Sequence, residues 1–400
     1  MDASAARKAD SALDNIQFFA AGERTMLNER TECLSGAATY TVAARRPQMR
    51  APSSAFHDRV GEGSRPEQTQ VRSGPSPRRG WAAYSSRAAR GPAPTVVVYH
   101  HLSTTPHKLT DGLGVNTDPD NFRRHMKYFA KNFDVIGPSD LIAGRLPKRP
   151  LLITFDDVYR SVLEVGGPIL KDANIQSVWF MNPDCLQAET LPLDNLLALA
   201  YAKYGGAGLM RTVSLSGKPP SSVPALISDY ISRLTYLQIA ELKAAICAGF
   251  TETQTQIRRG SNLFLTADDL KLLPDFGIHV GNHSLTHSFF RALSPTELQI
   301  EIVRSRELLE QLSGQSVTYL AIPYGNKLDA TGAALSTARA SGHQAIFLVH
   351  GRCNSWQPAD DVFYRICADR LRPEHLPISI EILPRLRTFR DWLRGERGGL

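Results

Sequence analysis

The chain has 400 residues, 42% of them hydrophobic, and its 46 basic and 39 acidic side chains give a formal net charge of +7. This length and composition allow one large domain with a sizeable core plus extensions. No run of eighteen apolar residues occurs, and no charged-then-apolar segment opens the chain, which argues against a membrane span and classical secretion. The five cysteines are scattered and form no Cys-x-x-Cys, so we expect no disulfide framework and a reducing, cytoplasmic location.

Residues 1–92 differ in composition from the rest of the chain. Between Val42 and Arg90 there are ten arginines against three acids, with many Ser, Pro and Gly residues. Such a segment buries too little apolar surface to offset chain entropy, so we predict a disordered basic extension. Its charge allows contact with nucleic acid or an anionic membrane. A solvated leader, or a start codon placed too far upstream, is the simpler explanation, so we expect no specific nucleic-acid partner.

After this extension the pattern alternates between strand and helix. Short apolar runs at Val96–Tyr99, Leu151–Phe155 and Ser177–Met181 are typical of buried parallel strands. An acidic cap at Asp118, followed by Pro119 in the first turn, predicts a helix start. Strands that alternate with helices indicate a parallel α/β architecture.

Residues 187–262 interrupt this alternation with helical sequence of mixed polarity. We expect an insertion at the rim of the fold, in a position to form part of a substrate groove. A capping box at Ser294–Glu297 then predicts a helix that runs to Gly314. Further strands are expected at Ile278–Val280, Tyr319–Ile322 and Ala345–Val349.

We therefore predict an α/β fold, a distorted TIM-like (β/α) barrel with parallel strands, over residues 93–375. A single barrel of this kind uses about 250 residues. Residues 376–400 are predicted to be a basic amphipathic tail helix that packs on the barrel, with contact to a membrane surface as the alternative.

Two adjacent carboxylates, Asp156 and Asp157, follow the apolar run Leu151–Phe155. A charged pair does not fit inside a buried strand, so we expect both at its carboxyl end, where barrels bind ligands. There one could bind a metal while the other accepts a proton. The alternative is that one caps the next helix and the other is solvated.

Two imidazoles, His283 and His287, lie four residues apart, and if that turn is helical both rings share one face. Spacing alone is weak evidence, because eleven histidines supply about 0.3 such pairs by chance. His279 extends the series but is expected to be an exposed strand residue. One carboxylate and two imidazoles form a ligand set for a divalent metal of the zinc type.

With these motifs the sequence resembles the polysaccharide deacetylases with a NodB homology domain, carbohydrate esterase family four. The likeness extends roughly from Thr95 to Ile366, and its three motifs occur in the family's order. The stretches that carry it are Val96-Val-Val-Tyr-His100, Thr154-Phe-Asp-Asp-Val-Tyr159, Leu273-Pro-Asp-Phe-Gly277, His283-Ser-Leu-Thr-His287 and Ile322-Pro-Tyr-Gly325.

The resemblance implies a role for each motif. Asp157, His283 and His287 would bind a divalent ion, expected to be zinc, and Asp156 would be the general base. The backbone N–H of Tyr324 would donate to the developing oxyanion. Without the resemblance, the Pro-Tyr-Gly turn is explained as a tight turn after a strand.

Three positions depart from the family pattern. Val158 replaces a glycine, which makes activity or substrate fit doubtful. Ala321 stands where many members carry an arginine that orients the base, and Arg365 is a candidate to supply that charge. Arg365 and Pro323 are also candidates for substrate contact. His350, at the end of an apolar strand, is the candidate general acid.

From these features we expect metal-dependent hydrolysis of the N-acetyl group of an amino sugar in an oligo- or polysaccharide, with release of acetate. The expected substrate is similar to a chitooligosaccharide. One alternative is another sugar amide hydrolase, such as a deformylase acting on a lipid-linked sugar. Another is a catalytically inactive glycan-binding protein. The sequence carries no signal for an oligomeric state.

Overall fold

The computed structural model describes residues 92–187, 190–213, 216–354 and 361–393. The predicted disordered extension therefore lies outside the described residues, except for Pro92. None of the helices within the described ranges combines the length and apolarity needed to cross a bilayer.

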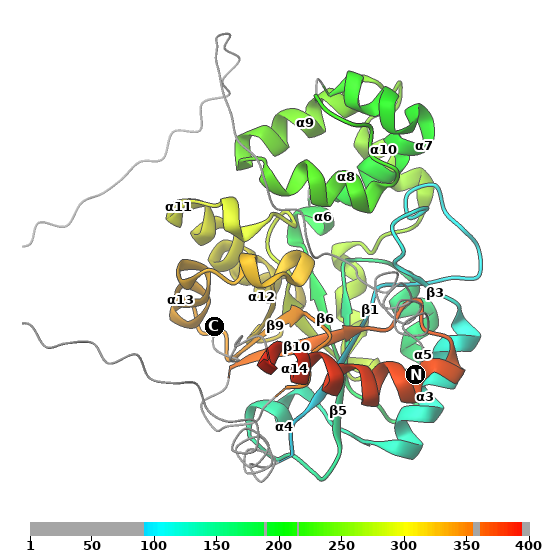
Figure 1. Cartoon of the computed structure of the whole chain (residues 1–400), viewed down its shortest axis with the longest axis vertical. Coiled ribbons are helices and arrows are strands. Elements are labelled where there is room, and N and C mark those ends of the chain that lie inside the picture. The colour runs from blue at the N-terminus through cyan, green and yellow to red at the C-terminus, as the bar shows by residue number, and fades with distance from the viewer. Residues whose placement is uncertain (1–91, 188–189, 214–215, 355–360, 394–400) are drawn as a thin grey trace, which may run out of the picture. The chain divides into compact units, whose positions relative to one another are not determined.

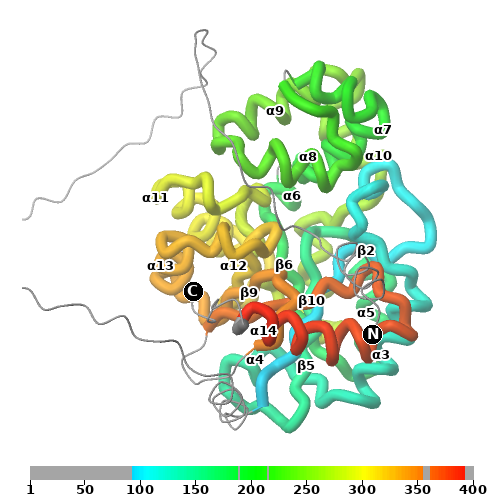
Figure 2. Tube along the Cα trace, in the orientation of Figure 1, coloured from blue at the N-terminus to red at the C-terminus, as the bar shows by residue number. Residues whose placement is uncertain are grey.

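Seven parallel strands close into a barrel (Figures 1 and 2). Their order around the barrel is β1, β10, β9, β8, β7, β6 and β5, and β5 pairs in turn with β1. The prediction of a distorted TIM-like barrel is confirmed. The barrel strands are β1 Thr95–Tyr99, β5 Pro150–Asp156, β6 Ser177–Met181, β7 Ile278–Asn282, β8 Tyr319–Ala321, β9 Ala345–Val349 and β10 Val362–Cys367. A short strand, β4 Asp134–Val135, adds to the start of β5, and β2 His101–Leu102 pairs with β3 Asn116–Thr117.

Strand β5 shows how the sequence builds the barrel interior. All seven of its residues are buried, as expected for a parallel strand covered on both faces. Because side chains alternate between faces, Leu152, Thr154 and Asp156 point to the same side. Leu152 belongs to an apolar cluster with residues from five other barrel strands, so this common side is the barrel interior. Asp156 is therefore the interior-facing residue at the carboxyl end of the strand.

Helices of the barrel domain cover the outside of the strands (Figure 1). Helix α3 begins as predicted, because Asp118 accepts from the N–H groups of Asp120 and Asn121 and Pro119 occupies the first turn. The capping box at Ser294 is also present, and its helical run ends at Gly314 with φ of 67°. The helices are α3 Pro119–Asn132, α4 Pro138–Ile142, α5 Gly167–Asp172, α6 Pro183–Gln187, α11 Pro295–Leu298, α12 Ser305–Ser313 and α13 Gly332–Ala340.

Four helices form the insertion, drawn in green in Figure 1. They are α7 Leu193–Thr212, which is broken at Gly205, α8 Val223–Asp229, α9 Tyr236–Ala248 and α10 Gln254–Ser261. The buried amide of Asn195 donates to the Leu109 carbonyl at 2.7 Å and to the Tyr159 hydroxyl at 2.9 Å. These bonds attach the start of α7 directly to the barrel.

The chain ends, within its described part, in helix α14 Leu383–Leu393. The Cys353 N–H donates to the Thr388 hydroxyl at 3.0 Å, and buried Arg352 pairs with buried Asp391 at 2.5 Å. This helix therefore packs on the segment that follows β9.

Candidate active site

The site begins with Asp156, which pairs with Arg365 inside the barrel. The Arg365 guanidinium donates to both oxygens of the Asp156 carboxylate, at 2.6 Å and 2.7 Å, and is itself fully buried. Burial by itself would raise the pKa of Asp156, but the charges of Arg365 and His283 lower it to about 2. Asp156 is thus an ionised carboxylate held in one orientation.

Arg365 lies beneath Asp156 rather than in an open groove. Its Nη1 also donates to the Thr154 hydroxyl at 3.3 Å, and its guanidinium lies over the Phe180 ring. Arg365 is thus placed to orient the Asp156 carboxylate, as expected of a charge that takes the place of the missing arginine. Its full burial offers no exposed surface for the substrate contact that was the other expectation.

Asp157 turns away from the barrel interior because its backbone is left-handed, with φ of 65°. This conformation is unfavourable for a residue with a side chain. The Trp179 indole N–H donates to the Asp157 carbonyl and holds the turn in place. The two neighbouring carboxylates therefore face different partners, as two separate roles require.

The histidine loop is not helical, which corrects the geometry suggested by the four-residue spacing. His283 follows directly after β7, and Ser284 and His287 have φ of 67° and 65°. Buried Asn182 donates to the carbonyls of His283 and Ser284, and the His287 N–H donates to the Ser284 hydroxyl at 3.0 Å. Local polar contacts and two left-handed residues thus bring the imidazoles together, with ring centroids 4.8 Å apart.

Asp157, His283 and His287 together have the geometry of a metal site. Asp157 Oδ1 lies 4.0 Å from His283 Nε2 and 3.8 Å from His287 Nε2, and all three ligand atoms fall within 4.8 Å of one another. Ligand atoms bonded at about 2.1 Å around a tetrahedral ion lie about 3.4 Å apart, so little adjustment is needed.

The second nitrogen of each imidazole faces an oxygen acceptor. His283 Nδ1 lies 2.8 Å from the Ala321 carbonyl, and His287 Nδ1 lies 3.3 Å from the Asp194 carboxylate. Partners of this kind fix the tautomer that leaves Nε2 free to bind a metal. Burial raises the pKa of Asp157, and a cation at this position would favour its ionised form. The residues present therefore fit a metal ion.

The Pro-Tyr-Gly turn lies beside His287. Tyr324 has φ of 60°, and its ring stacks on Phe289 at 3.7 Å and lies 4.6 Å from the His287 ring. Gly325 is required because an added Cβ would lie 2.2 Å from the Val349 nitrogen. A left-handed tyrosine costs about 1–2 kcal/mol, and the ring packing holds it in that state.

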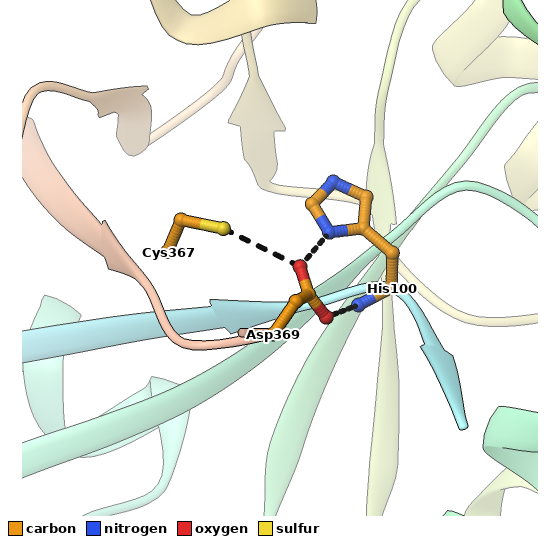
Figure 3. A group of neighbouring side chains, drawn as sticks. All are labelled: His100, Cys367 and Asp369. Carbon is orange, nitrogen blue, oxygen red and sulfur yellow. Dashed lines mark hydrogen bonds and ion pairs between the residues drawn. The ribbon is translucent and has the colours of Figure 1, made fainter. Parts of the chain in front are cut away.

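His100, at the end of β1, lies on the other side of Asp156. Its Nε2 is 4.0 Å from Asp156 Oδ2, and its Nδ1 is 2.6 Å from Asp369 Oδ2 (Figure 3). Burial lowers the pKa of His100, but the Asp369 carboxylate outweighs burial and raises it to about 9. His100 is therefore an imidazolium at neutral pH, with a proton available beside the paired carboxylate.

Cys367 completes the group shown in Figure 3, and its thiol donates to Asp369 Oδ2 at 3.3 Å. His100, Cys367 and Asp369 are also of types that bind metals. However, Asp369 Oδ1 already accepts from the His100 N–H at 2.9 Å and the Thr117 hydroxyl at 3.1 Å. With both oxygens hydrogen-bonded, the group is explained as a carboxylate that holds His100.

His350, the predicted general acid, does not lie beside the two aspartates of the first motif in its described contacts. Its ring contacts Tyr364, with centroids 5.6 Å apart, and burial and the charge of Arg352 lower its pKa. Its described interactions thus involve neither aspartate of the first motif. Pro323 was a candidate for substrate contact. It is buried in the turn that carries Tyr324, so its described role is to form that turn.

Val158 is fully buried within the main hydrophobic cluster. It is not among the described residues with positive φ, whereas its neighbour Asp157 is. The valine thus needs neither the open space nor the backbone freedom of a glycine.

The sequence-based prediction missed His100, Asp369 and Asp194. His100 directly follows β1, and Asp369 is the second residue after β10, and these positions could have suggested them. Asp194 lies in the insertion, where no sequence signal indicated a role.

Comparisons with known proteins agree with this site. A family model described as polysaccharide deacetylase matches residues 229–346, which contain the second and third motifs. No sequence among curated proteins matches the chain.

Several solved structures match the chain at low sequence identity. The deacetylase PplD of Streptococcus pyogenes, in complex with acetate, is 14% identical, with 72% of this chain and 98% of that chain covered and a TM-score of 0.49. A putative polysaccharide deacetylase of Bacillus anthracis, BA0330, is 15% identical, with 72% and 69% covered and a TM-score of 0.46. BA3943 of Bacillus anthracis, described as a CE4 family pseudoenzyme, is 11% identical, with 73% and 64% covered and a TM-score of 0.27.

The family model covers the histidine motif and the Pro-Tyr-Gly turn. The Asp-Asp motif lies at the end of β5 in the same barrel, and β6 lies between β5 and β7. The chain thus resembles the polysaccharide deacetylases in its motifs, and their family model matches it over residues 229–346.

Proposed function

We propose that this protein is a metal-dependent N-deacetylase that hydrolyses the N-acetyl group of an amino sugar in an oligo- or polysaccharide and releases acetate. The observation that carries the proposal is the convergence of three units at one end of the barrel. These are the Asp156–Arg365 pair, the ligand group Asp157, His283 and His287, and the His100–Asp369 pair.

Asp157, His283 and His287 would hold a divalent ion, and two imidazoles with one carboxylate favour zinc. Such an ion supplies Lewis-acid chemistry, because it lowers the pKa of water and polarises a carbonyl oxygen.

Asp156 is the general base. Its low pKa keeps it ionised at neutral pH, and the two bonds from Arg365 direct the carboxylate. In this position it accepts the proton of the water that attacks the acetyl carbonyl.

His100 is the general acid, in place of His350. It carries a proton at neutral pH, its Nδ1 is fixed by Asp369, and its Nε2 faces the base across 4.0 Å. From there Nε2 donates a proton to the leaving amine. The backbone N–H of Tyr324, in its left-handed turn, stabilises the developing oxyanion.

A small pocket of about 10 Å³ lies next to His287. It lies between the histidine loop, through Leu285 and Thr286, and the insertion, through Pro192 and Lys243. Its size suits one water molecule beside His287 and not a sugar ring.

The test is acetate release from chitin oligosaccharides by the full-length protein reconstituted with zinc, with the products identified by mass. We expect stoichiometric acetate and deacetylated sugar. Release of formate from N-formyl sugars alone would favour a deformylase. Binding of the oligosaccharide without any product would favour a glycan-binding protein and overturn the proposal.

A further inference from the structure

Asp194 connects the insertion to the metal site. It is the second residue of α7, and its carboxylate is 19% exposed. Its Oδ2 lies 3.3 Å from His287 Nδ1, and its Oδ1 accepts a hydrogen bond from the Tyr324 hydroxyl at 2.9 Å. One carboxylate of the insertion thus contacts two residues of the predicted site.

The contact with His287 orients a metal ligand. The Nε2 of His287 faces Asp157, and the carboxylate 3.3 Å from Nδ1 favours a proton on the nitrogen that does not bind metal. His283 has a carbonyl of the barrel, that of Ala321, in the same position. One imidazole is therefore oriented by the barrel and the other by the insertion.

The contact with Tyr324 supports the turn beside the site. The Tyr324 ring is held by its hydroxyl, which donates to Asp194, and by its face, which stacks on Phe289. Its backbone is left-handed. A tyrosine fixed in this way keeps its backbone N–H in one direction, as an oxyanion donor requires.

A simpler explanation is that Asp194 only stabilises the start of α7, where an acidic side chain is favourable. The residue before α7, Pro192, makes no side-chain capping bond, and the Asp194 carboxylate contacts His287 and Tyr324 across the interface with the barrel. The direction of these contacts favours a role in the site.

We propose that Asp194 is a positioning residue through which the insertion sets the metal affinity of the site and orients Tyr324. This inference rests on the proposed metal site. It assigns the insertion a part in catalysis through residues on the barrel.

The experiment measures zinc affinity of the full-length metal-free protein by competition with a fluorescent chelator. Asp194→Asn keeps the size of the side chain but removes the charge, and we expect zinc affinity to fall about 10- to 100-fold. Asp229→Asn makes the same change at an exposed position of the insertion and should leave zinc affinity unchanged. Equal melting temperatures of the metal-free variants would show that both are folded.

Tyr324→Phe separates the two contacts, because it removes only the hydroxyl. We expect wild-type zinc affinity and a kcat lowered about three- to tenfold at unchanged KM. If Asp194→Asn binds zinc as tightly as the wild type, or if Tyr324→Phe weakens zinc equally, the inference is wrong. If the wild type itself binds no zinc, the proposed function fails instead, so the two failures are distinguishable.

Discussion

His100 and His283 lie on two sides of the same carboxylate, yet their surroundings shift their pKa values in opposite directions. Their Nε2 atoms are 4.0 Å and 3.6 Å from Asp156 Oδ2. Burial lowers the pKa of both, but His100 has the Asp369 carboxylate at Nδ1, whereas His283 has only the neutral carbonyl of Ala321. The pKa of His100 is raised to about 9, and that of His283 is lowered to about 3.

The difference teaches that burial and the partner of the far nitrogen together set the charge of these two imidazoles. At His100 the Asp369 carboxylate outweighs burial and keeps the ring protonated, so His100 can donate a proton. A neutral acceptor in a buried place keeps the ring neutral, so His283 can bind a metal. Substitutions near His283 should therefore change zinc binding, whereas substitutions near His100 should change the pH dependence of turnover.

The largest effect on turnover is expected from loss of a metal ligand, His283. His283→Ala removes a neutral ligand, so zinc content per chain should fall and turnover should drop by about a thousandfold or more. Elemental analysis and acetate release measure the two effects. His279→Ala is the matched control, because it changes a half-buried histidine of β7, the strand that leads into the histidine loop. Unchanged zinc in His283→Ala would remove this site from consideration.

The next effect concerns the carboxylate between the two histidines. Asp156→Asn keeps Asp157 and both imidazoles, so zinc should stay bound while turnover falls about a hundredfold or more. Loss of the buried charge that pairs with Arg365 should also lower stability, by about 3–5 kcal/mol. Acetate release, zinc content and thermal melting test this, and wild-type turnover in Asp156→Asn would contradict the mechanism.

A smaller effect on turnover is expected from changes around His100, the proposed acid. The pH dependence of kcat/KM measures this effect most sharply. The raised pKa keeps His100 protonated below about pH 9, so kcat/KM should fall as the pH rises through that value. Asp369→Asn removes the charge that opposes burial, so the alkaline limb should move at least about one pH unit lower. At pH 8 the rate should then fall about 10- to 100-fold. Zinc affinity should not change, and a pH profile identical to that of the wild type would exclude His100 as the acid.

The smallest effect on turnover is expected from Val158→Gly. Its side chain packs in the core, so the change should lower the free energy of unfolding by about 2–4 kcal/mol. Turnover at a temperature where the variant is folded should stay within about threefold of the wild type. A tenfold gain in acetate release would show instead that the valine blocks the substrate.

Part of this architecture was readable from local sequence. The apolar runs Val96–Tyr99 and Leu151–Phe155 identify buried strands, and the caps at Asp118 and Ser294 identify helix starts, because these signals depend on neighbouring residues. Asp156 and Asp157 were placed correctly at a strand end for the same reason.

The geometry of the histidine loop was not readable in this way. A spacing of four residues suggested one helical face for His283 and His287. The structure instead uses left-handed backbone at Ser284 and His287. Buried Asn182, after β6, donates to the carbonyls of this loop, and buried Asn282, at the end of β7, accepts from the Ser284 N–H at 2.9 Å. Such conformations depend on tertiary contacts that a local pattern does not contain.

The sequence by itself determined the barrel class, the family resemblance and the identity of the residues in its motifs. Only the tertiary structure decided their partners: Arg365 for Asp156, 209 residues apart, and Asp369 for His100, 269 residues apart. The physical reason is barrel closure. Strand β1 pairs with β5 on one side and β10 on the other, so residues from the two ends of the domain meet at one rim, and their distance along the chain carries no information about that meeting.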